Sequence, residues 1–160
     1  MRLPKFVVSW LQHQAIAVSA SRDPDVVIGE NYLLRWHVIP RNTFFNIYLH
    51  CFLGSDDDRA HHCHPWANLS CLIGGRYIEH TIAAGGTHHQ KMYYPGALKF
   101  RTGAYAHRIE ILPDESCWTF FITGPKYREW YFHCKKRLVH WRDFTNPNDT
   151  GQIGAGCGEG

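Results

Sequence analysis

The sequence has no Cys-x-x-Cys pair, no long basic run and no internal repeat. The six cysteines are scattered, which excludes zinc-ribbon and thioredoxin motifs. No segment approaches the roughly 18 to 20 apolar residues that cross a bilayer. The formal net charge is only +3, so nothing indicates a nucleic-acid partner. We therefore expect a cytoplasmic protein with reduced thiols and with neither a membrane nor a nucleic-acid partner.

The residues that are present are typical of one globular, β-rich domain. The 160 residues suit a single core, and 44% of them are hydrophobic and 14% aromatic. Polar side chains at positions 12–14 interrupt the apolar N-terminal segment, which favours a short helix or packed arm over a signal peptide. We predict an N-terminal arm or helix over residues 1–30, a barrel over 31–145 and a flexible tail over 146–160.

Short strands separated by Gly, Pro or Asn turns account for most of the chain. Aromatic and β-branched residues mark about eight to ten of them, and no helix is expected after residue 30. The pattern predicts an all-β sandwich or closed barrel. The His88-His89 pair is expected in a solvated loop. The predicted strands cover residues 32–39, 44–52, 69–73, 77–82, 91–94, 97–101, 107–112, 117–122, 130–134 and 138–141.

The segment His61-His62-Cys63-His64 points to a metal site. Histidine is the commonest metal ligand in proteins, and the chain contains twelve. Because alternate side chains of a strand share a face, His62 and His64 can bind one ion together. Cys63 would then point away as a buried thiol. Two imidazoles do not complete a site, so a third ligand must come from elsewhere in the fold.

The spacing around this segment resembles the first motif of the cupin family, G-x5-H-x-H-x3,4-E-x6-G. His62, His64 and Gly75 stand at the matching positions. Asn68 replaces the Glu of the motif, and Asp56 replaces its opening Gly. The likeness therefore covers the two histidines and the closing glycine, while the acidic ligand of the motif is missing.

The second cupin motif, G-x5-P-x-G-x2-H-x3-N, is matched in part. Gly96 and His107 stand at its first Gly and its His. The chain also resembles small bacterial and phage cupins that share an H-x-H-P-W segment and a later T-G-P-x-x-R-E-W-x-F-H-C segment, found here at residues 123–134. The Pro, the second Gly and the Asn of the second motif are replaced by Thr102, Ala104 and Ile111.

The resemblance implies a cupin-type jelly-roll β-barrel with one divalent metal ion on His62, His64 and His107. Three imidazoles suit Fe, Zn, Ni or Mn, so the ligand type alone does not select the metal. Asn68 or Glu79 could add a fourth ligand. For Glu79 we favour instead an exposed strand position paired with a Lys or Arg. Many cupins pair through edge strands, so a homodimer is expected from the resemblance.

Four side chains near the motifs are candidates for contacting a small-molecule substrate. Trp66 follows His64 by two residues, so it would lie on the same face as the two histidines and could line the pocket. His50 could act as an acid–base or supporting group, and Tyr77 lies on the strand of Glu79. Arg59 could clamp a carboxylate or phosphate, although a solvated surface charge is the default interpretation for it.

Three functions fit these features. The first is a metal-dependent small-molecule dioxygenase or related oxidoreductase. The second is a metal-dependent isomerase or lyase that uses Zn or Mn without redox change. The third is a non-enzymatic sensor or binding module in which the ion anchors a ligand. The fold does not choose among them, because one fold hosts many functions.

Overall fold

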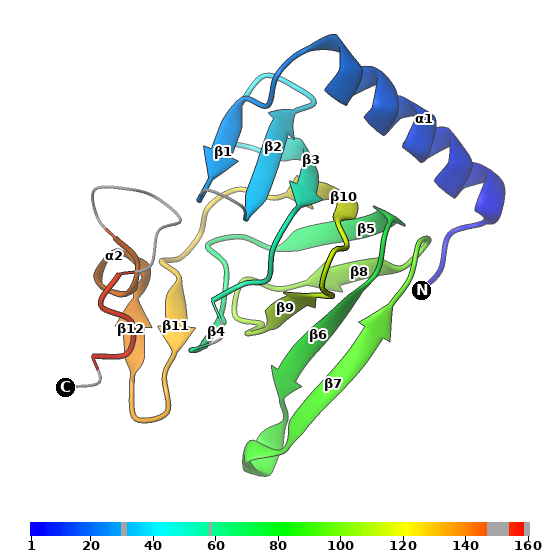
Figure 1. Ribbon diagram of the computed structural model, residues 1–160. Coiled ribbons are helices and arrows are strands. Elements are labelled where there is room, and N and C mark those ends of the chain that lie inside the picture. The colour runs from blue at the N-terminus through cyan, green and yellow to red at the C-terminus, as the bar shows by residue number, and fades with distance from the viewer. Residues whose placement is uncertain (30–31, 58, 147–153, 159–160) are drawn as a thin grey trace.

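The computed structural model describes residues 1–29, 32–57, 59–146 and 154–158. Two helices and twelve strands lie in this part of the chain, and they are arranged as three sheets with one long helix outside (Figure 1). The helices are α1 (Lys5–Ser21) and α2 (Trp141–Phe144). The strands are β1 (Val26–Ile28), β2 (Leu33–His37), β3 (Asn46–Phe52), β4 (His61–His62), β5 (Asn68–Gly74), β6 (Tyr77–Ile82), β7 (His88–Tyr93), β8 (Leu98–Arg101), β9 (Arg108–Ile111), β10 (Cys117–Thr123), β11 (Tyr131–His133) and β12 (Leu138–His140).

The largest sheet has six antiparallel strands in the order β1-β2-β3-β10-β5-β8. Because side chains alternate along each strand, the sheet presents two faces. The outer face packs against α1, and the contact centres on Ala15, Trp36 and Leu49. The inner face faces the other sheets. On this face, four residues from four neighbouring strands are paired side by side in the register: Arg35, His50, Thr119 and Leu72.

Two three-stranded sheets, β7-β6-β9 and β12-β11-β4, complete the fold. Leu72 of the large sheet packs with Tyr77 of β6 and Ile109 of β9, so the main core lies between the sheets. The strands form facing β-sheet layers, and an N-terminal helix is present as predicted. The sheets do not close into a continuous barrel: among the described residues β7 pairs only with β6, and β8 only with β5.

A smaller cluster joins the β11–β12 hairpin to the C-terminal segment. The rings of Phe132 and Phe144 stack, and Phe144 is fully buried. A disulfide links Cys134 to Cys157. The prediction that all thiols are reduced is therefore wrong for these two. Their pairing depends on a distant segment returning to the hairpin, which spacing alone does not reveal.

The ten predicted strands all occur, and their ends differ from the prediction by at most three residues. The loop predicted for His88-His89 is wrong, because β7 begins at His88 and the turn lies at residues 83–87. The predicted absence of helix after residue 30 is wrong by the four residues of α2. The unpredicted β1 falls inside the predicted N-terminal arm. Most of the predicted tail, 147–153 and 159–160, lies outside the described residues.

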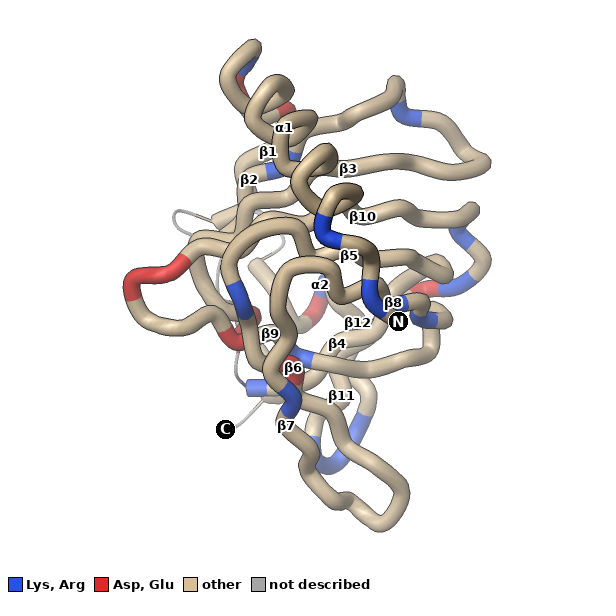
Figure 2. Tube along the Cα trace, turned by 90° about the vertical axis from the view of Figure 1, so that its right-hand side faces the viewer, with Lys and Arg blue, Asp and Glu red and all other residues tan. Residues whose placement is uncertain are grey.

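No helix in the described part of the chain has the length and apolar character that spanning a membrane requires. Lys and Arg positions are distributed over the helix, the strands and the loops (Figure 2).

Candidate metal centre

His62 and His107 are placed side by side by their own backbones. The amide of each donates to the carbonyl of the other, with N–O distances of 2.9 and 3.0 Å. His62 ends β4 and His107 directly precedes β9. This two-residue bridge joins segments 45 positions apart, so the third ligand predicted from the motif spacing does meet the first.

His64 completes the cluster from the segment that follows β4. Its amide donates to the carbonyl of Gly103, which continues the extended course of β4 by two residues. The prediction that His62 and His64 share one face therefore holds, although β4 itself ends at His62. Cys63 faces the other way, is fully buried, and accepts a hydrogen bond from the Tyr131 amide through its sulfur.

One ring nitrogen from each of the three histidines lies within 4.8 Å of the others. The Nε2 atoms of His64 and His107 are 3.0 Å apart. Two nitrogens that each lie about 2.1 Å from one ion are separated by about 3.0 to 3.4 Å. The spacing therefore fits shared coordination of one ion. In the described part of the chain, no other group of three His, Cys, Asp or Glu residues converges in this way.

Carboxylates stand behind two of the three imidazoles. Oε1 of Glu79 is 3.0 Å from Nδ1 of His107, and Oδ2 of Asp56 is 3.7 Å from Nδ1 of His62. A carboxylate on Nδ1 orients the ring and leaves Nε2 as the free electron-pair donor. Glu79 thus supports a ligand from behind and lies on the wrong side of the ring to be one itself.

Two of the three imidazoles, those of His62 and His64, are held in the neutral form that binds metal. Burial lowers the pKa of His62 to about 4, against an opposing effect of the Asp56 carboxylate. Burial also holds the pKa of His64 well below its usual value, and the neighbouring His62 and His107 lower it further. Near neutral pH these rings carry no proton that a metal ion would have to displace.

Glu79 is buried, at 3% exposure, and the prediction of an exposed position is wrong. The predicted pairing is correct, because its two oxygens contact Nζ of Lys99 and a guanidinium nitrogen of Arg101, each at 3.0 Å. Burial alone would raise the pKa of Glu79, but the hydrogen bond with His107 and the two cationic charges lower it strongly. The Glu79 carboxylate is therefore ionised and lies behind the His107 ring.

Asn68 occupies the motif position of the missing Glu. It begins β5 and is buried at 4% exposure, and its side-chain nitrogen Nδ2 has no hydrogen-bond partner. Asn68 pairs with Thr123 and Arg101 in the sheet register, so it belongs to the inner face. A buried amide without a partner is costly.

The four predicted substrate contacts fall in four different places. Trp66 stacks on the His64 ring at 5.2 Å between centroids, and His50 is buried on the inner face. Tyr77 is buried in the main core. Arg59 is exposed, and its guanidinium pairs with Asp57. The structure brings Trp66 to the candidate centre and His50 to the inner face, whereas Tyr77 and Arg59 lie elsewhere.

Arg35 is the inner-face residue that the sequence interpretation missed. Its Nε donates to Nε2 of His50 at 2.8 Å, and its guanidinium lies over the Tyr48 ring at 4.9 Å. Burial lowers its pKa. The positive charge of Arg35 also lowers the pKa of His64, so the two groups share one electrostatic environment. A single arginine within the apolar strand 33–37 was the signal available in the sequence.

Solved structures with the same arrangement of strands show that the chain has a cupin fold. Neither the protein-family models nor the curated proteins contain a match to the sequence. An oxalate decarboxylase of Bacillus subtilis, which carries Mn(II) centres, is similar over 71% of this chain with 17% identity and a TM-score of 0.50. The chain spans 30% of the length of that enzyme.

Two smaller proteins have the same fold. A candidate mannose-6-phosphate isomerase from Ralstonia eutropha matches 63% of this chain and 92% of its own, with 14% identity and a TM-score of 0.50. An uncharacterised protein with a double-stranded β-helix domain from Klebsiella pneumoniae matches 72% and 85%, with 13% identity and a TM-score of 0.50. At these identities the likeness shows the fold alone.

Proposed function

We propose that this cupin is a metal-dependent enzyme that acts on a small molecule, with dioxygenase or related oxidoreductase chemistry as the leading reaction class. The observation that carries the proposal is the convergence of three imidazoles, with carboxylates behind His62 and His107.

The three histidines supply neutral ligands, so a divalent ion would keep its full charge and open positions. Fe, Mn, Ni and Zn all suit such a set. When bound, the ion supplies a Lewis acid and, for Fe or Mn, a redox centre. Glu79 holds the proton of His107 at Nδ1, which keeps Nε2 directed at the ion.

The substrate side is assigned to the inner face next to His64. Trp66 stacks on His64, and Phe121 contacts both His64 and His50, with ring centroids 6.1 and 5.3 Å away. Beyond this aromatic wall lies the Arg35–His50 pair. We assign Trp66 and His50 to substrate contact and Arg35 to orienting a polar group of the substrate. Tyr77 and Arg59 are not assigned there.

Metal analysis tests the centre. Protein purified without chelators is expected to hold close to one divalent ion per chain, and His107→Ala to lose most of it. His89→Ala is the matched control, since His89 is exposed on β7 and is not one of the three convergent histidines. Metal retained by His107→Ala, or lost equally by His89→Ala, would refute the ligand assignment.

Oxygen consumption tests the reaction class. The Fe- or Mn-loaded protein is incubated with a panel of thiols, carboxylic acids and sugars, and His107→Ala serves as the inactive reference. Oxygen uptake that depends on both metal and substrate supports the oxidoreductase. A loaded protein that turns over a substrate without oxygen would instead be an isomerase or lyase, and one that only binds ligands would be a sensor.

A further inference from the structure

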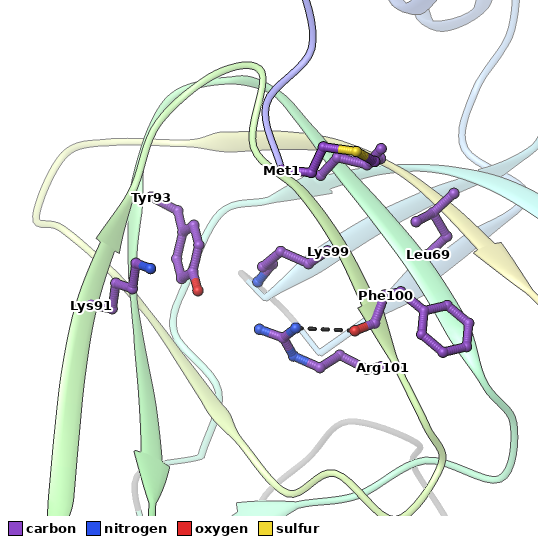
Figure 3. A pocket seen from close by; sticks show the side chains of 8 residues that line it. Met1, Leu69, Lys91, Tyr93, Lys99, Phe100 and Arg101 are labelled. Carbon is purple, nitrogen blue, oxygen red and sulfur yellow. Dashed lines mark hydrogen bonds between the residues drawn. The ribbon is translucent and has the colours of Figure 1, made fainter.

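A cavity of about 330 Å³ lies at the gap between β7 and β8, where the six-stranded sheet and the β7-β6-β9 sheet do not join (Figure 3). Its inner wall is formed by side chains of β7 and β8 that point toward one another, and its outer wall by apolar side chains around the edge of β8. The lining residues are Met1, Leu69, Lys91, Tyr93, Leu98, Lys99, Phe100 and Arg101.

The cavity is strongly cationic. Lys91, Lys99 and Arg101 all line it. Among the described residues, the one carboxylate that pairs with them is Glu79, which contacts Lys99 and Arg101. Lys91 lies opposite Glu79 in the β6–β7 register but forms no ion pair with a described residue. Three positive groups therefore share one negative charge, which is itself also engaged by His107.

Two of the cationic side chains, Lys99 and Arg101, carry buried nitrogens and share one carboxylate. Lys99 is only 6% exposed, and burial lowers its pKa although the Glu79 carboxylate acts in the opposite direction. Nε of Arg101 is buried and has no acceptor. The ammonium groups of Lys91 and Lys99 lie 5.3 and 4.5 Å from the centre of the Tyr93 ring. Buried charges of one sign are costly unless an opposite charge joins them.

We propose that this cavity is a binding site for a small oxyanion, a carboxylate or a phosphate group, held by Lys91, Lys99 and Arg101. The planar guanidinium and the two ammonium groups supply the charge-assisted donors that such oxygens prefer. None of the residues that line the cavity is one of the three convergent histidines. Glu79 links the two places, because its Oε1 contacts both Nζ of Lys99 and Nδ1 of His107, and its Oε2 contacts Arg101.

Isothermal titration of the full chain with inorganic phosphate, and in a second series with malonate, tests the site at constant ionic strength. Saturable binding of one anion per chain is expected for at least one probe. Lys91→Met removes one charge-assisted contact at an exposed position and is expected to weaken binding about tenfold. Lys99→Met, which keeps the length of the chain, is expected to weaken it at least as much. Binding of phosphate alone indicates a phosphoryl ligand, and binding of malonate alone a carboxylate.

Lys136→Met is the matched control, because it removes the same charge from an exposed loop outside the cavity. It is expected to bind like the unaltered protein. Circular dichroism checks that Lys99→Met is folded, and the exposed Lys91→Met keeps the test valid if it is not. The titration is repeated after chelation of any metal. Binding that disappears with the metal, equal weakening in Lys136→Met, or no saturable binding would each overturn the proposal, whereas binding that survives chelation supports it whether or not the metal centre is correct.

Discussion

Replacing Glu79 by Gln removes one charge while keeping the side chain nearly isosteric. Two separate effects are expected. The amide is a weaker acceptor for Nδ1–H of His107, and loss of such a supporting group typically costs about 10- to 100-fold in metal affinity, or about 1.4 to 2.7 kcal/mol. The substitution also leaves Lys99 without its counter-charge, and breaking a buried pair in this way costs about 3 to 5 kcal/mol of stability.

The double variant Glu79→Gln/Lys99→Met separates the two effects. Removing the buried ammonium together with the carboxylate restores the charge balance, so part of the free energy of unfolding is expected to return. The metal affinity is expected to stay low, because the carboxylate behind His107 is still absent. Urea unfolding of the chelated protein measures the first quantity, and competition with a chromophoric chelator for Zn(II) measures the second.

The result that would refute this reasoning is a metal affinity that follows stability. If the double variant recovers both quantities together, Glu79 acts only by holding the fold. If Glu79→Gln binds Zn(II) as tightly as the unaltered chain, the 3.0 Å contact with Nδ1 does not tune the ligand. His107→Ala, measured beside them, sets the affinity expected when a ligand is lost outright.

Three further outcomes are expected. Burial holds the pKa of His50 well below 6.5, so the unfolded chain binds the proton first as the pH falls. The free energy of unfolding should therefore decrease below pH 6.5 by up to about 1.4 kcal/mol per pH unit for each such histidine. Urea unfolding on both sides of that pH should show a smaller change per pH unit for His50→Phe, and an equal change would contradict this. Gly75 has a φ of 69°, and a Cβ there would lie 2.0 Å from the Ser116 carbonyl oxygen. Gly75→Ala should therefore cost well over the roughly 1 to 2 kcal/mol of the left-handed conformation, whereas Gly85→Ala, with a φ of 82° and open space around it, should cost no more than that; equal thermal shifts would refute the steric reasoning. Cys157→Ser removes a crosslink that spans 23 positions and should lower the free energy of unfolding by about 3 kcal/mol, an effect that should vanish when both proteins are measured under reductant.

The strands were predictable because their signals are local. Aromatic and β-branched residues alternate between Gly, Pro and Asn turns, and a buried sheet face fixes the alternation. The segment 26–28 was missed because three apolar residues carry too short a pattern to distinguish a strand from a loop. The unclosed gap between β7 and β8 was missed for another reason: strand pairing between distant segments depends on packing that no local window contains.

The convergence of the three histidines was predictable for two different physical reasons. His62 and His64 share a face by the period of an extended chain, which is a local property. His107 could be placed only through the motif spacing of the cupin family. Neither the strand period nor the motif spacing could predict the surroundings of Glu79, because Lys99 and Arg101 contact it from β8, a strand of the opposite sheet. Arg35 was overlooked because a charged residue in a strand is more often solvated than buried.

The two departures from the cupin motif have a common physical meaning. At the motif's opening Gly, the Asp56 carboxylate accepts hydrogen bonds from the Ile109 amide and the Tyr32 hydroxyl, and it stands behind His62. It thereby holds β9, and with it His107, beside the segment that carries His62. At the motif's Glu, neutral Asn68 contributes no charge. Negative charge that the motif places directly on the ion is supplied here from behind the imidazoles, by Asp56 and Glu79. An ion held by these three histidines would have neutral ligands only, so its attraction for an anion would not be reduced by a ligated carboxylate.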